Sequence, residues 1–358
     1  MCYFCQDENL GIIQTRWEHI NRNYNILTRA IATGIDVHFL IEQSGRFAAG
    51  VFQNFNGSGG IIKRQALLDA GGWQIDTLAE DLDASYRIQL KGYRFLFLRE
   101  LLSPGEVPLT VPSFKKQQGR WACGSLRTAK KLLPTVLLDK DLSLKKRFEA
   151  FVHLTGYIVH PLMFISFLLG CTTTIFNIDV YRISSTFPPS QAGINNATIK
   201  IFFTHPQFII WGLLTVLIGL CTVAVWIPPM IVLKDQVLPF WRKLLNVLVL
   251  FLLGFGISLN NTIEAGKALL TNRNWAFVRT PKYALQQGKE GWQNKRYQIK
   301  LSFEWIPELL LVALGLTAIT DSFIELNYGE LMWLIPFTAS YAFVAILTIL
   351  QSRRVSTV

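Results

Sequence analysis

The apolar residues of this 358-residue chain are gathered into runs long enough to cross a membrane. A bilayer-spanning helix needs about 20 apolar residues. After Phe148 four runs reach this length, the third only with its flanks: Phe151–Phe176, Phe208–Leu233, Ile306–Ile319 and Leu331–Leu350. Residues 1–148 form instead a mixed, charge-rich sequence. The sequence therefore predicts a globular N-terminal part followed by membrane helices.

Lys and Arg predict the orientation of these helices, because cytoplasmic flanks carry an excess of both. Residues 113–148 hold ten basic and two acidic side chains, and residues 263–302 hold eight and two. Both stretches are expected in the cytoplasm, so an even number of crossings separates them. Two loops with few basic residues are expected outside: 177–206 and 321–330. The run within 236–262 is therefore predicted to lie in the membrane interface, with a fifth span as the alternative.

Composition excludes several other classes of protein. Twenty-five Phe and ten Trp bury too much surface for intrinsic disorder. Five Cys are too few for a disulfide scaffold. The net charge of +11 is concentrated beside the membrane segments, which indicates anionic lipid heads and not nucleic acid.

Residues 1–110 alternate short strands and helices, a pattern typical of an α/β sheet domain. Strands are expected at three places: Gly11–Thr15, Gly50–Phe55 and Arg94–Leu98. Helices are expected at three others: Glu18–Ala32, Lys63–Asp69 and Leu82–Leu90. A complete domain of this kind usually has more strands before them.

Three carboxylates stand within four positions at the start of a predicted helix, in Glu80-Asp81-Leu82-Asp83. Acidic residues favour a helix N-terminus through the dipole, and this is the commoner reason for such a cluster. A carboxylate held there can also take a proton from a hydroxyl nucleophile. Both interpretations are open on this motif alone.

Two other segments carry chemistry that suits a sugar ligand. In Gln117-Gln118-Gly119-Arg120-Trp121, the Arg offers paired donors to phosphate and the Trp a flat face for a sugar ring. A basic amphipathic helix at the membrane surface is the alternative. In the turn Phe55–Gly60, Asn56 and Gly57 begin a glycine-rich run that lets backbone approach a ligand. A plain tight turn is the commoner explanation.

In order and spacing, the segments FNGSGG, AGGW, AEDLD and QQGRW, followed by membrane helices, resemble family 2 glycosyltransferases. The likeness is greatest to the processive β-glycan synthases, such as cellulose and glucomannan synthases, and extends from Gly11 to Lys282. It implies an α/β fold, a partial GT-A-like domain, followed by an all-α transmembrane region. It implies an inverting transferase of the plasma or inner membrane, with its catalytic region in the cytoplasm, acting on a nucleotide sugar and a glycan acceptor.

The resemblance also assigns roles to single residues. It implies that Asp81 is the catalytic base, with Glu80 beside it in the Glu-Asp pair of the motif. It implies that Trp121 stacks under the acceptor sugar, and that Gln117 and Arg120 lie near the donor diphosphate or the acceptor. The chain departs from the motif at position 79, where Ala replaces the usual Thr.

The segment Phe277–Lys282 resembles the gating-loop motif F-x-V-T-x-K of cellulose synthases. Phe277, Thr280 and Lys282 match this motif, whereas Arg279 stands where Val is usual. In the family this loop lies over the donor site, which requires it to be cytoplasmic. The charge count places it on the same side independently.

The family holds a divalent metal, Mg or Mn, with an Asp-x-Asp pair upstream of the region that resembles Gly11–Trp17. No Asp-x-Asp precedes Asp81 in this chain, so no metal ligand is predicted in it. We therefore expect the C-terminal part of an enzyme, inactive alone, that lacks an N-terminal portion or needs a partner subunit. UDP-glucose and GDP-mannose are both possible donors. The alternatives are a non-processive transferase with a lipid acceptor and a truncated inactive membrane protein.

Polar and aromatic side chains of the membrane part are candidates to line a path for the glycan. His153 and His160 lie on one face of the first span and are expected to face protein or a cavity. Tyr157, Trp211 and Trp226 are stacking candidates, with lipid-facing or interfacial positions favoured for each.

The resulting division of the chain has five parts. They are the C-terminal part of a glycosyltransferase domain (1–112), a basic interfacial segment with the QxxRW motif (113–148), two membrane helices with an interfacial helix (149–262), a cytoplasmic gating-type loop (263–302), and two membrane helices with a cytoplasmic tail (303–358).

Overall fold

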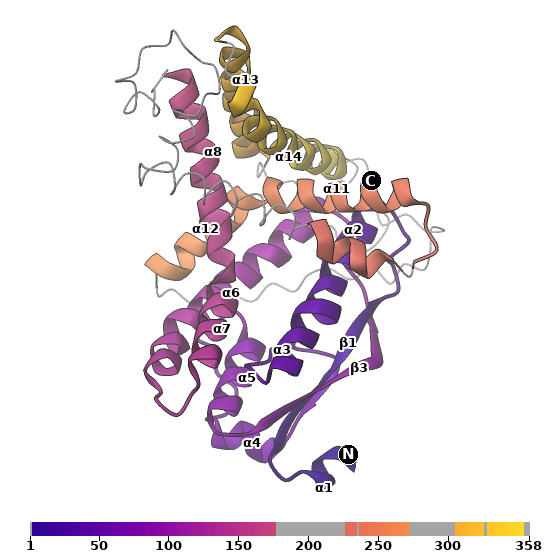
Figure 1. Cartoon of the computed structure of the whole chain (residues 1–358), viewed down its shortest axis with the longest axis vertical. Helices are drawn as coiled ribbons and strands as arrows, with labels where there is room; N and C mark the ends of the chain where they lie inside the picture. Colours follow the sequence, from indigo (N-terminus) through magenta and orange to yellow (C-terminus); the bar gives the residue numbers. More distant parts are fainter. Residues whose placement is uncertain (1, 177–225, 235, 272–304, 326–327, 354–358) are drawn as a thin grey trace, which may run out of the picture.

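The computed structural model describes residues 2–176, 226–234, 236–271, 305–325 and 328–353. A small sheet with its helices lies at one end of the molecule, and a group of long helices lies at the other (Figure 1). The predicted gating residues Phe277, Thr280 and Lys282 lie outside the described residues, as do Trp211 and most of the predicted span Phe208–Leu233.

The sheet has three strands in the order β2-β1-β3. The central strand β1 (Leu10–His19) pairs in parallel with β3 (Arg94–Gly105) and antiparallel with the short β2 (Gly60–Ile62). Ile13 of β1 lies opposite Ile61 on one side and Leu96 on the other. The predicted strands Gly11–Thr15 and Arg94–Leu98 are therefore confirmed, and both are longer than expected.

Helices pack on this sheet around an aromatic core. They are α1 (Cys2–Gln6), α2 (Ile26–Val37), the π-helix η1 (His38–Gln43), α3 (Ser44–Ala49), α4 (Arg64–Asp69) and α5 (Glu80–Leu90). The core joins Ile12 of the sheet to Phe39 of η1, Ile88 of α5 and Phe97 of β3. The helices predicted at Lys63–Asp69 and Leu82–Leu90 are confirmed by α4 and α5.

Two predicted elements are wrong. The helix expected at Glu18–Ala32 begins only at Ile26, because β1 continues to His19 and Asn25 caps α2 by accepting from the backbone N–H of Thr28. The strand expected at Gly50–Phe55 is an irregular segment with buried Val51, Phe52 and Phe55.

Glutamine side chains take the place of a neighbouring strand along that segment. The N–H of Gln53 donates to Oε1 of Gln89 at 2.9 Å, and Nε2 of Gln89 donates to the carbonyl of Gln53 at 2.8 Å. The N–H of Asn56 donates to Oε1 of Gln14 at 3.0 Å. Buried backbone groups need partners, and side-chain amides supply them here without a sheet ladder.

Helix α6 (Val111–Leu138) connects the sheet domain to the long helices. Thr110 caps its start through the N–H of Ser113, and Pro112 suits its first turn. The chain continues through α7 (Leu144–Thr155), the short η2 (Gly156–Ile158) and α8 (Val159–Ile175). Helix α6 packs against α7 and also against α12 (Ser258–Leu270), which comes much later in the chain.

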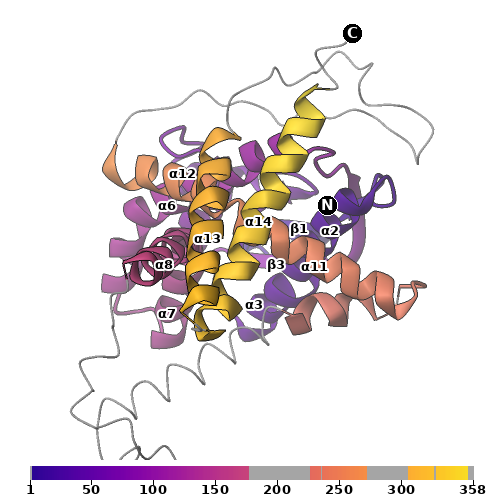
Figure 2. The same cartoon turned by 90° about the horizontal axis from the view of Figure 1, so that it is seen from above.

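Within the described part of the chain, three helical segments are long and apolar enough to cross a membrane: Leu144–Ile175, Ile306–Ile324 and Glu330–Gln351. They correspond to α7–α8, α13 (Ile306–Ile324) and most of α14 (Tyr328–Arg353). Helices α13 and α14 lie side by side, with α8 next to them (Figure 2). These segments agree with three of the four predicted spans.

Helix α11 (Phe240–Gly256) runs across the direction of α8, between α2 of the sheet domain and α14 (Figure 1). Together with α12, from which it is bent by 44°, it also has the length and composition of one broken span. Gly256 permits the close crossing with α14, because a Cβ there would lie 2.5 Å from the carbonyl oxygen of Ser340.

Candidate functional site

A cavity of about 500 Å³ is lined both by residues of the acidic motif and by residues of the long helices. Its walls come from η1, the segment before β2, the start of α5, α6, η2 and α11. Its lining includes Asn56, Asp81 and Trp121 together with Tyr157, His160 and Leu250. The cavity therefore joins the predicted catalytic motifs to the membrane part.

Asp81 lies in the first turn of α5 with its carboxylate on the cavity wall. Its Oδ1 accepts a hydrogen bond from the N–H of Leu82 at 2.8 Å. Burial raises the pKa of Asp81 to about 6, the charge of Glu80 adds to this, and Leu82 and Arg120 oppose it. A carboxyl group with this pKa is mostly ionised at neutral pH and still binds a proton readily, as a general base requires.

The glycine-rich turn lies directly against this carboxylate. Gly57 has a φ of +73°, and a Cβ at this position would lie 2.7 Å from Oδ2 of Asp81. Beside it, Oδ1 of Asn56 is 3.2 Å from Nε2 of His38 and accepts from Nδ2 of Asn54. The turn thus brings backbone and an amide side chain to the base, as only glycine permits at position 57.

The third carboxylate of the acidic motif has another role. Asp83 is fully buried and forms ion pairs with Arg87 at 2.7 Å and Lys131 of α6 at 2.9 Å. Arg87 also donates to the carbonyl of Gly72, which fixes the AGGW turn. Asp83 therefore holds α5, α6 and this turn together, whereas Asp81 faces the cavity.

Helix α6 presents its motif to the same cavity. Gln118 and Trp121 line the wall, whereas the Oε1 of Gln117 is buried with no hydrogen-bond partner among the described residues. The charges of Asp81 and Glu80 both raise the pKa of Arg120, so its guanidinium lies within their field, although burial lowers that pKa overall. The structure thus places Trp121 on the cavity that Asp81 also lines, and Arg120 within the field of Asp81.

A glycine also sets the distance between α6 and the acidic motif. A Cβ at Gly124 would lie 2.7 Å from the Cβ of Ala79 and 2.8 Å from its backbone nitrogen. The small side chain of Ala79, which stands where Thr is usual, lies in this contact. One turn of α6 separates Gly124 from Trp121, so the contact keeps the indole close to Asp81.

Side chains from the membrane part complete the wall. Tyr157 donates from its hydroxyl to Oε1 of Gln118 at 3.2 Å and stacks on His160, with 5.8 Å between ring centroids. His153 contacts the cavity and lies 2.7 Å through Nδ1 from the hydroxyl of Tyr86. A lipid-facing position, one of the two favoured for Tyr157, is therefore wrong, and the interfacial position stays a prediction. The expected protein- or cavity-facing position of His153 and His160 is confirmed. Trp226 stacks on Phe251.

Sequence analysis missed two groups of the wall, His38 and Glu42 of η1. Their side chains lie 3.1 Å apart, from Nδ1 to Oε2, and the hydrogen bond with His38 lowers the pKa of Glu42. A His and a Glu four positions apart in a helical pattern are a signal for such a pair. The stronger signal is structural, since π-helical turns occur frequently at functional sites.

The described residues do not form a site for a divalent metal. In this part of the chain no three His, Cys, Asp or Glu side chains gather in a way that could hold one. Asp81 and Asp83, the Asp-x-Asp of the acidic motif, have different surroundings, and Asp83 is neutralised by Arg87 and Lys131. This pair therefore does not fit a metal.

Comparison with known proteins shows plant relatives of the chain. The chain is 29% identical over 201 residues to probable glucomannan 4-beta-mannosyltransferase 9 of Oryza sativa subsp. japonica, and 32% over 200 residues to glucomannan 4-beta-mannosyltransferase 1 of Cyamopsis tetragonoloba. Each alignment covers 54% of this chain and 38% of the relative. The chain thus spans less than half the length of these relatives.

A family-wide comparison covers more of the chain. The sequence profile of the family described as Glycosyl transferase family group 2 matches residues 1–259, which include the sheet, the acidic motif, α6 and α11. The cavity with Asp81 and Trp121 lies almost entirely within this region. The chain belongs to glycosyl transferase family group 2.

Proposed function

We propose that this chain carries the base and the acceptor site of a membrane-bound inverting glycosyltransferase that lengthens a β-glycan. The observation that carries the proposal is the position of Asp81, with a pKa raised to about 6, in a cavity that also holds Trp121 and continues to Tyr157. A sugar stacked on the indole of Trp121 has its hydroxyl groups within reach of a base there.

In the proposed reaction, a carboxylate oxygen of Asp81 accepts the proton of an acceptor hydroxyl. The acceptor oxygen forms a bond to the anomeric carbon of the donor, while the bond from that carbon to the phosphate oxygen breaks. Attack opposite the leaving group inverts the anomeric centre. Arg120, which lies near Asp81 and Glu80, is suited to bind an anionic group of the donor.

The relatives' names support a mannosyl donor, since both compared proteins are described as glucomannan 4-beta-mannosyltransferases. GDP-mannose is therefore the first donor to test, with UDP-glucose as the second. Members of the family generally use a divalent metal, which stabilises a departing diphosphate. The described residues offer no ligand set for it. That a further N-terminal portion or a partner subunit supplies the ligands stays a prediction.

The proposed placement puts the sheet domain and the QxxRW helix in the cytoplasm. The basic excess of residues 113–148 supports it, and so does α11, which lies across α8 and between α2 and α14 as an interfacial helix would. In this arrangement the cavity opens from the cytoplasmic site into the membrane part, which suits an enzyme that passes its product through the bilayer.

The proposal is tested with membranes that contain the natural protein, radiolabelled GDP-mannose or UDP-glucose and a manno-oligosaccharide acceptor. We expect the natural protein to transfer label into oligosaccharides, and the Asp81→Asn variant to transfer none. Label that partitions into organic solvent would instead show the lipid-acceptor alternative. Sustained transfer by the 358-residue chain alone would contradict the predicted need for a further portion or partner.

A further inference from the structure

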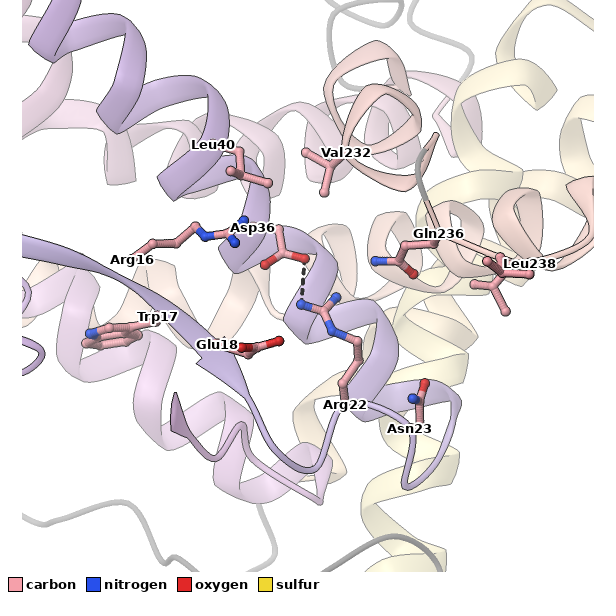
Figure 3. A pocket seen from close by; sticks show the side chains of 11 residues that line it. Arg16, Trp17, Glu18, Arg22, Asn23, Asp36, Leu40, Val232, Gln236 and Leu238 are labelled. Carbon is pink, nitrogen blue, oxygen red and sulfur yellow. Dashed lines mark ion pairs between the residues drawn. The ribbon is translucent and has the colours of Figure 1, made fainter. Parts of the chain in front are cut away.

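A second cavity, of about 460 Å³, lies beside the first and shares Trp17 with it. Its lining comes from the end of β1 and the turn after it, from α2 and η1, and from Val232 and Gln236–Leu238 before α11 (Figure 3). Nothing in the proposed reaction uses it. Its charged side chains come from the sheet domain, whereas Gln236 and most of the apolar lining, Val232, Val237 and Leu238, come from the residues before α11.

Two arginines in this cavity have unused hydrogen-bond donors. The guanidinium groups of Arg16 and Arg22 point toward Asp36 from different sides (Figure 3), but only Arg22 forms an ion pair with it, at 2.6 Å. Among the residues that the structure describes, none is hydrogen-bonded or ion-paired with the side chain of Arg16. The Nε of Arg16 and the Nη1 of Arg22 are buried and unpartnered. Buried N–H groups are normally hydrogen-bonded, so both donors are suited to a bound acceptor.

The same cavity also carries negative charge. Glu18 lines it with an exposed carboxylate, and Asp36 balances Arg22. Among the described residues that line the cavity, two arginines and two carboxylates sum to zero, so a ligand with only negative charge is poorly matched. A ligand that joins a phosphate to an ammonium group matches both signs, with the phosphate at the arginines and the ammonium at Glu18.

The position of the cavity indicates a lipid as the source of this chemistry. The predicted span Phe208–Leu233 ends at the cavity, where Val232 lies on the rim, and α11 begins just after it at Phe240. Arg242 lies 5.0 Å from the ring of Trp241, a pair typical of the headgroup layer. Val237 and Leu238, which also line the cavity, are apolar.

We propose that this cavity binds the headgroup of a zwitterionic phospholipid of the phosphatidylethanolamine class. The phosphate accepts from Arg16 and from Nη1 of Arg22, the ammonium group pairs with Glu18, and the acyl chains leave along Val232 and Leu238. The bound lipid joins the sheet domain to the start of the interfacial helix. It is a site separate from the acceptor cavity.

The test is native mass spectrometry of the delipidated chain in detergent, titrated with palmitoyl-oleoyl phosphatidylethanolamine or phosphatidylglycerol. We expect Arg16→Gln and Glu18→Gln each to weaken phosphatidylethanolamine binding about tenfold, the loss of one charge-assisted hydrogen bond. Arg99→Gln, on the exposed part of β3, is the matched control and leaves binding unchanged. Thermal unfolding measures whether each variant is folded. Because the Glu18 side chain is exposed, we expect Glu18→Gln to keep the melting temperature of the unmodified chain.

Phosphatidylglycerol has the phosphate without the ammonium, so it separates the two halves of the site. We expect it to bind more weakly than phosphatidylethanolamine, and Glu18→Gln to abolish that preference. Equal or tighter binding of phosphatidylglycerol to the unmodified chain would overturn the zwitterionic assignment. If millimolar inorganic phosphate displaces the lipid, and Glu18→Gln binds the lipid as tightly as the unmodified chain, the cavity is a free-phosphate site instead. Full lipid binding by a folded Arg16→Gln variant would refute the site.

Discussion

Asp81 is the residue whose surroundings bear most directly on the proposed chemistry. Its pKa is raised to about 6, chiefly by burial, and a base acts only when it is deprotonated. We therefore expect kcat/KM of the natural protein to rise about tenfold per pH unit below 6 and to level off above it. A profile between pH 5 and 8 measures this, with Asp81→Asn at background throughout. A flat profile from pH 5 to 7 would exclude Asp81 as the base.

Gly57 is the second residue on which the site depends. Gly57 has a φ of +73°, and a Cβ added there would lie only 2.7 Å from Oδ2 of Asp81. The substitution Gly57→Ala therefore strains the turn and pushes the carboxylate aside. We expect transfer to fall at least about tenfold in a folded chain. Gly45→Ala in α3 is the control, because a Cβ there meets nothing within 4 Å. Equal activity of both variants would show that the turn does not position the base.

The residues of the site differ in how far the sequence predicts them. Asp81, Arg120 and Trp121 belong to motifs. Asp81 and Trp121 line one cavity, and Arg120 lies within the field of the Asp81 carboxylate. His38 and Tyr86 belong to no motif. His38 contacts Asn56 and Tyr86 contacts His153, and both contacts form only when the chain folds. Their contribution depends on packing between distant segments, which local patterns do not encode.

At the scale of elements, α5 and α6 are held together by the buried carboxylate of Asp83. Removing its charge leaves Arg87 and Lys131 without their buried counter-ion, so Asp83→Asn is expected to destabilise the fold by about 3–5 kcal/mol. Asp76 pairs with the same Lys131 but is exposed, so Asp76→Asn is expected to cost under about 1 kcal/mol. Thermal unfolding of both variants in detergent measures the difference. Similar melting temperatures would contradict the bridging role of Asp83.

Elements with a strong local signal are predicted best. The β-branched run in β1, the helix that follows the acidic motif and the long apolar runs are all present. The strand predicted at Gly50–Phe55 is absent for a physical reason. The apolar residues of this segment are buried as those of a strand would be, but the side chains of Gln14 and Gln89 supply hydrogen bonds to the backbone there. A sequence pattern reports burial, and it does not report which groups satisfy the backbone.

At the scale of the whole molecule, a sheet domain is joined to membrane helices through contacts distant in sequence. Helix α6 packs against α12, α11 lies between α2 and α14, and one ion pair connects α6 to α13. Hydropathy predicts where helices cross and charge predicts their direction, but neither predicts these pairings. They decide whether the QxxRW helix keeps its position when the membrane helices move.

The ion pair between Lys115 of α6 and Glu308 of α13 is nearly inaccessible to solvent, which makes it a test of this connection. Glu308→Gln leaves the Lys115 ammonium buried without its counter-ion, and we expect a loss of about 3–5 kcal/mol in stability. The double variant Lys115→Met with Glu308→Met removes both charges, so it is expected to recover most of that loss. Glu325→Gln, an exposed position at the other end of α13, is the control.

Thermal unfolding in detergent and transfer activity are measured on the same preparations. Because Lys115 precedes Gln117 by two residues on α6, breaking the pair is expected to lower transfer together with stability, and the double variant to restore both. If Glu308→Gln unfolds at the same temperature as Glu325→Gln, the pair does not connect the two parts. If stability falls while transfer per folded molecule is unchanged, α6 is positioned by its contacts with α12 and Ala79, and the membrane helices act only as an anchor.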